Sequence, residues 1–431
     1  MSDVTPIPTV RSFHGRVPVP GDKSLGHRAL MFAALAEGVS TVASLPSGAD
    51  VRSTRSVLTS LGVQFENLTD GAVRVIGCGG NFANPATPLD CGNSGTTMRL
   101  MTGILAGAGI DATLVGDASL TARPMARVAK PLAAFGAEVT TTDGKPPLKA
   151  HSHGGKTLKA PAEPISTGVA SAQVKSALLL AGLFAEGTTT VVEPAASRDH
   201  TERYMRWLGV PIRADGLSIS IDGPARPKAF TQTVACDPSS AAFVAAVAML
   251  CDDADVTIPR VLYNPSRLGF FRALSAMGAD VQFSDPAPDG PEEVADIRVR
   301  SGRLTGTRID GELSLDSLDE LPLLAVMGAF AEGETIVADA AELRHKESDR
   351  IASTAAMVRA LGGTIEERED GWRIVGGPLR GGEIDAGHDH RIALSGAVAG
   401  SRLPGVTVRN FAVAEVSFPG FLDVLRRFGS E

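Results

Sequence analysis

The chain has 431 residues, of which 43% are hydrophobic, and its 49 acidic and 41 basic side chains give a formal net charge of −8. A chain of this length exceeds what one hydrophobic core supports, so we expect two domains. The net negative charge argues against general nucleic-acid binding, and we expect no nucleic-acid partner. Local clusters of basic residues are therefore interpreted as sites for small anions.

Several other classes of protein are disfavoured by sequence patterns. Residues 1–10 lack a basic start followed by an apolar run, so no secretory signal is expected. The longest apolar run, Ala241 to Cys251, is far too short to span a membrane. The four cysteines have no CxxC spacing, and the eight histidines form no HExxH motif. We therefore expect a cytoplasmic protein with reduced thiols, no membrane contact, no metal and no cofactor.

Two short phrases recur along the chain. In the first, a helix of small apolar residues ends in Gly or Asp and a β-branched strand follows; clear copies lie at 33–42, 182–191 and 328–337. Looser copies end near Gly109, Asp253 and Gly400. In the second phrase an apolar residue precedes glycine, at Leu61-Gly62, Phe135-Gly136, Leu208-Gly209, Met277-Gly278, Leu361-Gly362 and Phe428-Gly429. The spacing of about 70 residues predicts six units, each reading strand, helix, strand, helix, strands.

The first helix of each unit is apolar on nearly all sides, which is typical of a buried helix. These helices are predicted at 29–37, 95–107, 169–185, 239–251, 321–331 and 390–399. The second helices, such as 51–61 and 348–361, carry polar residues on one side and are amphipathic. We therefore predict an α/β protein of two domains with three units each, in which parallel helices are buried and sheets lie outside.

The first buried helix begins in the stretch Pro20-Gly21-Asp22-Lys23-Ser24-Leu25-Gly26-His27-Arg28. Ser24 is the predicted N-cap, and it shares a helix face with Arg28. Free backbone amides and the positive end of the helix dipole attract phosphate or carboxylate at such a position. Taken alone, however, this stretch is more simply a solvated charged turn.

Basic residues recur at equivalent helix starts, where ordinary helices favour acidic ones. They are Lys23, Arg28, Arg123, Lys346, Arg350 and Arg391. A single serine or aspartate at such a position is best interpreted as a cap, but a set of bases there is unfavourable unless an anion binds. Asp319 and Glu347, which lie beside them, are candidates for general acid–base chemistry. The sequence contains neither a serine nucleophile elbow nor a cysteine in a basic loop. Covalent catalysis is therefore not indicated.

Five motifs, in chain order, resemble the signatures of the 3-phosphoshikimate 1-carboxyvinyltransferase (EPSP synthase) family. They are the stretches 20–28, 92–100 (Gly-Asn-Ser-Gly-Thr-Thr-Met-Arg-Leu), 120–125 (Leu-Thr-Ala-Arg-Pro-Met), 346–350 (Lys-Glu-Ser-Asp-Arg) and 389–391 (Asp-His-Arg). The resemblance runs from about residue 8 to the C-terminus. It implies a two-domain inside-out α/β barrel of six βαβαββ repeats, and a monomer.

The family fold, carried over, gives a discontinuous domain of residues 1–19 and 238–431 on the phosphoenolpyruvate side. Residues 20–237 form the domain on the shikimate 3-phosphate side. The chain is then expected to cross between domains near Pro20 and near Cys236-Asp237.

The resemblance also implies the reaction and its residues. The 5-hydroxyl of shikimate 3-phosphate attacks C2 of phosphoenolpyruvate while C3 is protonated, and the tetrahedral intermediate then loses phosphate, a step towards chorismate and the aromatic amino acids. Shikimate 3-phosphate is expected at Lys23, Ser24, Arg28, Ser171, Gln173, Arg198, Asp319 and Lys346. Phosphoenolpyruvate is expected at Lys23, Gly95, Arg123, Gln173, Arg350 and Arg391. The catalytic residues are expected to be Asp319 as the base on the 5-hydroxyl, Lys346 and Glu347 for the proton at C3, and Lys23.

The chain departs from the family pattern in places, and two rival functions stay open. Ala172 stands where a second serine is frequent, and Val416 stands where many members have a lysine; no lysine follows Lys346. Gly95 suggests room for the inhibitor glyphosate. One rival is the sister enolpyruvyl transferase that acts on a UDP-amino sugar, but its usual catalytic cysteine is absent from residues 117–125. The other is a non-catalytic anion-binding homologue.

Overall fold

The chain forms two compact units in the computed structural model, which describes residues 4–429. We call the first the split unit; it comprises the described chain up to Pro20, Ala235–Ala287, and the described chain from Glu293 onward. We call the second the inserted unit; it comprises Gly21–Val234 and Pro288–Glu292. Residues 1–3, part of the stretch 1–10 in which we expect no secretory signal, lie outside the described residues. No helix within residues 4–429 is long and apolar enough to cross a membrane.

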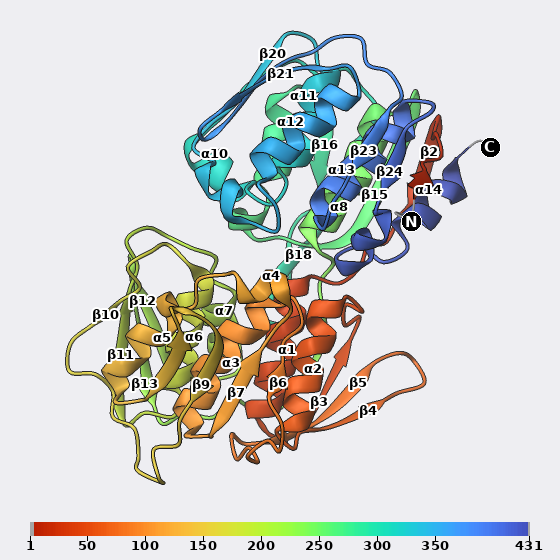
Figure 1. Ribbon diagram of the computed structural model, residues 1–431. Coiled ribbons are helices and arrows are strands. Elements are labelled where there is room, and N and C mark those ends of the chain that lie inside the picture. Colours follow the sequence, from red (N-terminus) through yellow and green to blue (C-terminus); the bar gives the residue numbers. More distant parts are fainter. Residues whose placement is uncertain (1–3, 430–431) are drawn as a thin grey trace. The chain divides into compact units, whose positions relative to one another are not determined.

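The inserted unit contains three buried helices, α1, α3 and α6, and five amphipathic or short ones (Figure 1). Its helices are α1 (Lys23–Leu35), α2 (Ala49–Ser60), α3 (Gly95–Ala108), α4 (Ala118–Thr121), α5 (Ala126–Leu132), η1 (Ala133–Phe135), α6 (Ala172–Gly182) and α7 (His200–Trp207). Its strands are β3 (Glu37–Ala43), β4 (Gln64–Asn67), β5 (Val73–Cys78), β6 (Leu89–Asp90), β7 (Ala112–Val115), β8 (Val139–Thr142), β9 (Lys145–Ala150), β10 (Ile165–Ser166), β11 (Gly187–Val192), β12 (Ile212–Asp215), β13 (Ser218–Gly223) and β14 (Thr231–Thr233).

Three four-stranded sheets of the same design make up the strands of the inserted unit. Their strand orders are β6-β7-β9-β8, β10-β11-β13-β12 and β14-β3-β5-β4. In each sheet the first pair is parallel and the others are antiparallel, with Leu89 opposite Leu114 and Ile165 opposite Val191. Strand β14 lies near the C-terminal end of the segment Gly21–Val234, yet it belongs to the sheet of the first repeat, because it pairs with β3.

The split unit repeats this design. Its helices are α8 (Pro238–Leu250), η2 (Pro265–Arg267), α9 (Gly269–Ala276), α10 (Gly311–Asp316), α11 (Leu321–Phe330), η3 (Ala341–His345), α12 (Arg350–Ala360), α13 (His390–Arg402), η4 (Phe411–Val416) and α14 (Phe421–Phe428). Its strands are β1 (Val4–Pro6), β2 (Ser12–Arg16), β15 (Asp253–Leu262), β16 (Val281–Phe283), β17 (Ala287–Asp289), β18 (Glu292–Arg300), β19 (Arg308–Ile309), β20 (Glu334–Val337), β21 (Thr364–Arg368), β22 (Gly371–Val375), β23 (Glu383–Asp385) and β24 (Thr407–Arg409). The sheet orders are β16-β18-β15-β2 with β17 beside β18, β19-β20-β22-β21 and β1-β24-β23.

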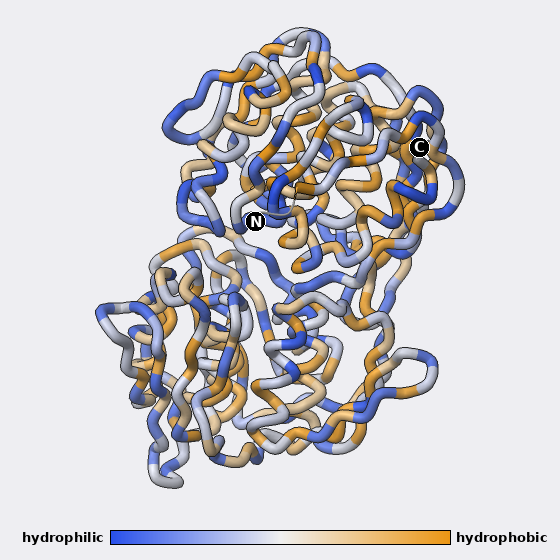
Figure 2. The backbone as a smooth tube through the Cα atoms, turned by 45° about the vertical axis from the view of Figure 1, so that its right-hand side comes forward, coloured by the Kyte–Doolittle hydropathy of each residue, from blue (hydrophilic) through white to orange (hydrophobic). Residues whose placement is uncertain are grey.

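The first helix of every repeat is buried, and the predicted six-unit architecture is confirmed. In α8 and α11 nearly every residue is buried, and Figure 2 shows hydrophobic segments inside each unit. Strands such as β9 alternate buried and exposed residues, because one face of each sheet covers helices while the other meets solvent. Glycine allows close helix packing: a Cβ on Gly103 of α3 would lie 2.1 Å from the carbonyl oxygen of Ala177 of α6.

The start of α1 differs from the prediction. Helix α1 begins at Lys23, and Asp22 is its N-cap, since its Oδ1 accepts a 2.8 Å hydrogen bond from the backbone amide of Leu25. Ser24, the predicted N-cap, lies inside the first turn. Aspartate is as good a cap as serine, and the fully buried Asp22 side chain therefore starts the helix two residues earlier.

The segment Pro288–Glu292 also departs from the prediction, because the predicted domain 238–431 includes it without interruption whereas it packs with the inserted unit. The physical reason is Glu292, whose buried carboxylate accepts a 2.7 Å hydrogen bond from Nδ1 of His200 and lies 3.4 Å from Nη1 of Arg203. Which substrate each unit binds stays a prediction.

Candidate functional site

Lys23 lies in the first turn of α1, where the helix dipole is positive. Its Nζ is 3.1 Å from Oδ2 of Asp50, in the first turn of α2. The Lys23 side chain is 34% exposed and that of Asp50 only 13%, so the lysine side chain is the more accessible of the two. Ser24 follows in the same turn and is half-buried. An ammonium and a hydroxyl at a helix N-terminus favour an anionic ligand.

Arg28 is buried one turn further along α1, and all its hydrogen bonds go to neutral oxygen atoms. Its Nε donates to Oγ1 of Thr201 at 2.8 Å, and its Nη2 donates to Oγ of Ser176 at 3.0 Å. Its Nη1 donates to the carbonyl oxygen of Ser24 at 3.1 Å. Burial lowers the pKa of Arg28, and the charge of Glu202 opposes this most strongly. Because these hydrogen-bond partners are neutral, they do not cancel the positive charge of the buried Arg28, and an anionic ligand can do so.

Three predicted shikimate 3-phosphate residues lie on α6 or in the loop before α7. Ser171 is the N-cap residue of α6, and its hydroxyl makes no capping hydrogen bond. The side-chain amide of Gln173 donates to Oγ1 of Thr96 at 2.9 Å and accepts from Nη1 of Arg99 at 2.5 Å. Arg198 is half-buried between β11 and α7.

The start of α3 brings two guanidinium groups to one point. Ser94 caps this helix, and a Cβ on Gly95 would lie 2.8 Å from Nη1 of Arg99 and 3.4 Å from Nη1 of Arg123. Nη2 of Arg123 donates to Oδ1 of Asn93 at 2.6 Å. Two cations beside a helix N-terminus are suited to a carboxylate or phosphate group. The sequence-based choice of residues missed Arg99 and Asn93, although both belong to the motif at 92–100.

In the split unit, Arg350 at the start of α12 is surrounded by carboxylates. Its Nε and Nη2 donate to Asp389 at 2.8 and 3.3 Å, and its Nη2 donates to Glu347 at 2.7 Å. Oδ1 of Asp319 lies 3.8 Å from its Nη1. Burial alone would lower the pKa of Arg350, but Asp389 and Glu347 raise it above its ordinary value. Burial would likewise raise the pKa of Asp389, but Arg350 lowers it.

The neighbouring carboxylates Asp319 and Glu320 have different environments. Glu320 is buried, and its Oε1 accepts hydrogen bonds from Nη1 of Arg391 at 3.2 Å and from Oγ of Ser239 at 2.5 Å. The Asp319 side chain is 24% exposed. Glu320 therefore holds Arg391 in place, while Asp319 keeps part of its carboxylate accessible to a substrate.

The remaining predicted residues of the split unit lie just before α12 and near the C-terminus. Lys346 directly follows η3, and its Nζ donates to Oε1 of Glu342 at 3.2 Å. Glu347 follows it and pairs with Arg350. Val416, at the family's usual lysine position, ends η4 and is half-buried. Within the split unit the structure thus gathers Asp319, Glu347 and Arg350, whereas Lys346 is bonded to a different glutamate.

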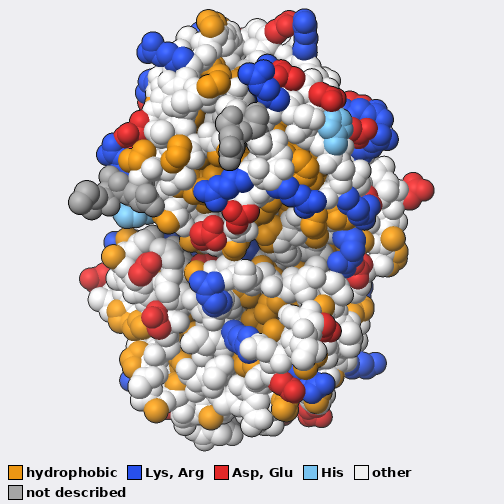
Figure 3. All heavy atoms as spheres, turned by 90° about the vertical axis from the view of Figure 1, so that its right-hand side faces the viewer, with side chains coloured by type: hydrophobic (Ala, Val, Ile, Leu, Met, Phe, Trp, Pro, Cys, Tyr) orange, Lys and Arg blue, Asp and Glu red, His pale blue; other side chains and the backbone are white. Residues whose placement is uncertain are grey.

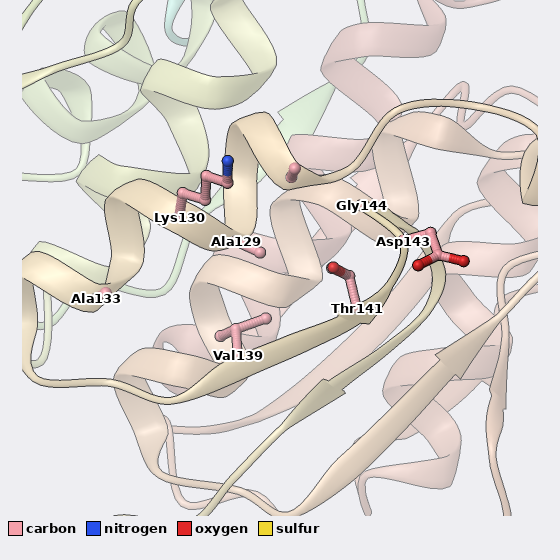
Figure 4. Close-up of a pocket in the computed structure, with 8 residues that line it drawn as sticks. Ala129, Lys130, Ala133, Val139, Thr141, Asp143 and Gly144 are labelled. Carbon is pink, nitrogen blue, oxygen red and sulfur yellow. The ribbon is translucent and has the colours of Figure 1, made fainter.

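The remaining features are a surface hollow, the charges on one face of the molecule, and the question of a metal site. A hollow of about 580 Å³ lies between α5 and the β8–β9 hairpin (Figure 4), and no predicted site residue lines it. Its lining is Ala126, Ala129, Lys130, Ala133, Val139, Thr141, Asp143 and Gly144. On the face drawn in Figure 3, Lys and Arg side chains are interspersed with Asp and Glu. Within residues 4–429, no cluster of three or more His, Cys, Asp or Glu side chains is arranged to hold a metal ion.

Comparison with known proteins identifies the family. The model of the EPSP synthase (3-phosphoshikimate 1-carboxyvinyltransferase) family matches residues 8–425. The chain belongs to the EPSP synthase family.

Relatives of known sequence or structure agree with this assignment. The chain is 47% identical over 422 residues to the 3-phosphoshikimate 1-carboxyvinyltransferase of Halorhodospira halophila, covering 97% of this chain and 94% of the relative. The solved EPSP synthase from Acinetobacter baumannii superposes with a TM-score of 0.90 at 40% identity, covering 100% of this chain and 98% of that one. The enolpyruvyl transferase NikO from Streptomyces tendae, with a TM-score of 0.78 and 19% identity, shares the fold. The family resemblance and the two-unit α/β fold predicted from the sequence are both confirmed.

Proposed function

We propose that this protein transfers the enolpyruvyl group of phosphoenolpyruvate to the 5-hydroxyl of shikimate 3-phosphate. Membership of the EPSP synthase family supports this function. The observation that carries it within the molecule is Arg28, a buried guanidinium bonded to neutral oxygens, which is suited to a phosphate group. The product would be 5-enolpyruvylshikimate 3-phosphate, with release of inorganic phosphate.

Shikimate 3-phosphate would be held by cations and hydroxyls of the inserted unit. Arg28 and Lys23 supply positive charge, and Ser24 and Ser171 supply hydroxyls at the starts of α1 and α6. Arg198 adds a further cation from the loop before α7. Asp319 and Lys346 of the split unit are proposed to reach the same substrate. This assignment would place the phosphate at two helix N-termini, where backbone amides and helix dipoles favour negative charge.

Phosphoenolpyruvate would bind where arginines are held at fixed positions by other side chains. In the inserted unit these are Arg123 beside Gly95, with Gln173 and Lys23 nearby in the proposed site. In the split unit they are Arg350 and Arg391, each oriented by carboxylates. Arginine grips a carboxylate or phosphate through two parallel N–H groups, so pre-oriented arginines lose little entropy on binding.

The proposed chemistry is an addition followed by an elimination. Asp319 accepts the proton of the 5-hydroxyl while that oxygen bonds to C2 of phosphoenolpyruvate, and Lys346 or Glu347 delivers a proton to C3. The C2–O bond to phosphate then breaks, C3 returns its proton, and the enol ether forms. Asp319 suits the role of base because Glu320 is buried and already bonded to Arg391 and Ser239. Cationic groups surrounding both anionic substrates would stabilise the charge of the transition state.

Several narrower statements belong to the same proposal. We expect the protein to act in the cytoplasm as a monomer, in the pathway to chorismate. Gly95 would leave room for glyphosate in the phosphoenolpyruvate pocket, so glyphosate should compete with phosphoenolpyruvate. The half-buried Val416 offers no cation to phosphoenolpyruvate, so its affinity would depend on Arg123, Arg350 and Arg391.

Phosphate release tests this function against its rivals. The purified protein should release phosphate when mixed with phosphoenolpyruvate and shikimate 3-phosphate, and not with either alone. Release with UDP-N-acetylglucosamine in place of shikimate 3-phosphate would favour the sister enolpyruvyl transferase. Binding of shikimate 3-phosphate without any release would favour a non-catalytic homologue.

A further inference from the structure

A buried cluster of three charges lies beneath the proposed shikimate 3-phosphate site of the inserted unit. Nζ of Lys175 on α6 lies 2.7 Å from Oε2 of Glu193 and 2.7 Å from Oε1 of Glu202. The three side chains are 2%, 2% and 5% exposed, respectively. Burying charged groups is costly, and an arrangement of two carboxylates on one ammonium requires a reason beyond packing.

The cluster joins both ends of one loop to α6. Glu193 directly follows β11, and Glu202 lies in the first turn of α7, so the loop 193–199 between them is fixed at each end to the same lysine. The loop's own Ser197 adds to this attachment: its Oγ donates to Glu193, and its carbonyl oxygen lies 3.4 Å from Nζ of Lys175. Arg198 is the next residue.

The direct neighbours of the cluster hold Arg28. Ser176 follows Lys175 on α6, and Thr201 precedes Glu202 on α7. Their hydroxyls lie 2.6 Å apart, and each accepts a hydrogen bond from the guanidinium of Arg28. A shift of either helix start would therefore move the partners of Arg28.

We propose that Lys175, Glu193 and Glu202 are positioning residues for shikimate 3-phosphate. This inference rests on the proposed function. The charges set the distance between the starts of α6 and α7, and thereby fix Arg198, Ser171 and the hydroxyl partners of Arg28. None of the three is expected to touch shikimate 3-phosphate. All three belong to the inserted unit, whereas Arg350 and Arg391, proposed for phosphoenolpyruvate, belong to the split unit.

Charge-conserving substitutions separate positioning from electrostatics. Glu202→Asp and Glu193→Asp keep every charge but shorten the reach to Lys175 by one methylene group. We expect the KM for shikimate 3-phosphate to rise about 10- to 100-fold in each, because small displacements of binding groups have effects of this size. The KM for phosphoenolpyruvate should change much less, because Gln173 alone among its proposed ligands lies at the start of α6, and kcat at saturating substrate should stay unchanged.

Glu202→Gln provides the opposing test, since Glu202 is the carboxylate whose charge acts most strongly on Arg28. If the cluster acted only through charge, this substitution would tighten binding of the phosphate dianion, and Glu202→Asp would leave it unchanged. If the cluster positions residues, both substitutions weaken binding. Tighter binding in Glu202→Gln together with unchanged binding in Glu202→Asp would overturn the inference.

Leu148→Ala is a matched control for loss of stability, because Leu148 is fully buried on β9 in a different sheet. It should lower the melting temperature without changing the KM for shikimate 3-phosphate. Calorimetric titration of shikimate 3-phosphate into each folded variant separates the two levels of the argument. If the unmodified protein does not bind this compound, the proposed function fails; if it binds and both aspartate variants bind equally well, only the positioning role fails.

Discussion

Replacing Arg350 by methionine should destabilise the split unit strongly at neutral pH and much less in mild acid. Asp389 is fully buried, and the substitution removes its guanidinium partner, Arg350, while retaining its bonds from Ser348 Oγ and the Arg391 amide, both 2.9 Å. Removing one partner of a buried ion pair costs about 3–5 kcal/mol, and the two remaining hydrogen bonds favour the lower end, about 3 kcal/mol. Glu347, being partly exposed, adds little.

The pH dependence follows from the pKa of Asp389. In the unmodified protein Arg350 lowers this pKa, so the stabilisation is present above the unfolded value of about 3.9 and is lost as the pH falls through the lower folded value. Without Arg350, burial raises the pKa of Asp389 above the unfolded value. The variant then loses stability as the pH rises through that raised value. The difference between the two proteins is therefore largest near neutrality and shrinks in acid.

Urea unfolding at about pH 7 and about pH 5 measures this difference. Trp372 is a suitable probe, because it is fully buried in the split unit and its Nε1 donates to the carbonyl oxygen of Ile351, next to Arg350 on α12. A Trp207→Phe background removes the other tryptophan, which belongs to the inserted unit. A loss below about 1 kcal/mol at neutral pH, or an equal loss at both pH values, would refute the reasoning.

Four further substitutions test the proposed site. Lys23→Ala should lower kcat/KM by at least about 100-fold while leaving the melting temperature nearly unchanged, since partly exposed ion pairs contribute about 1 kcal/mol or less; a large loss of stability would indicate a structural role. Gly95→Ala should raise the KM for phosphoenolpyruvate about tenfold, because its Cβ would lie 2.8 Å from Nη1 of Arg99; an unchanged KM contradicts this. Asp319→Asn should lower kcat by about 100-fold or more, whereas Glu320→Gln should chiefly raise the KM for phosphoenolpyruvate; the reverse result would reassign the base.

The repeats could be predicted from the sequence because each buried helix is apolar on nearly all sides and is followed by Gly or Asp and then a strand. Such patterns depend on local burial alone. The start of α1 was missed because Asp22 and Ser24 are equally good caps, and only the burial of the Asp22 carboxylate decides between them. The excursion Pro288–Glu292 was missed for a different reason: its cause is a contact between Glu292 and His200, which are 92 residues apart.

The candidate site was only partly predictable. Bases at helix starts are visible in the sequence because they oppose the helix dipole, and the structure gives Arg28 and Arg350 contrasting environments that the sequence cannot distinguish. One is held by hydroxyls and the other by carboxylates. Lys175 was interpreted as part of an apolar helix, because its partners Glu193 and Glu202 come from a strand end and another helix.

The route of the chain through the two units bears on modularity. A Cβ on Gly21 would lie 3.2 Å from Cγ1 of Val234, so the first and last residues of the segment Gly21–Val234 lie side by side. Adjacent ends are the geometry expected of a domain that can be inserted into, or removed from, another domain as a single segment. Glu292 prevents that independence: excised as 21–234, the unit would retain His200 and Arg203 without the carboxylate that both face. The inserted unit is therefore complete only with five residues, Pro288–Glu292, that the chain supplies from outside 21–234.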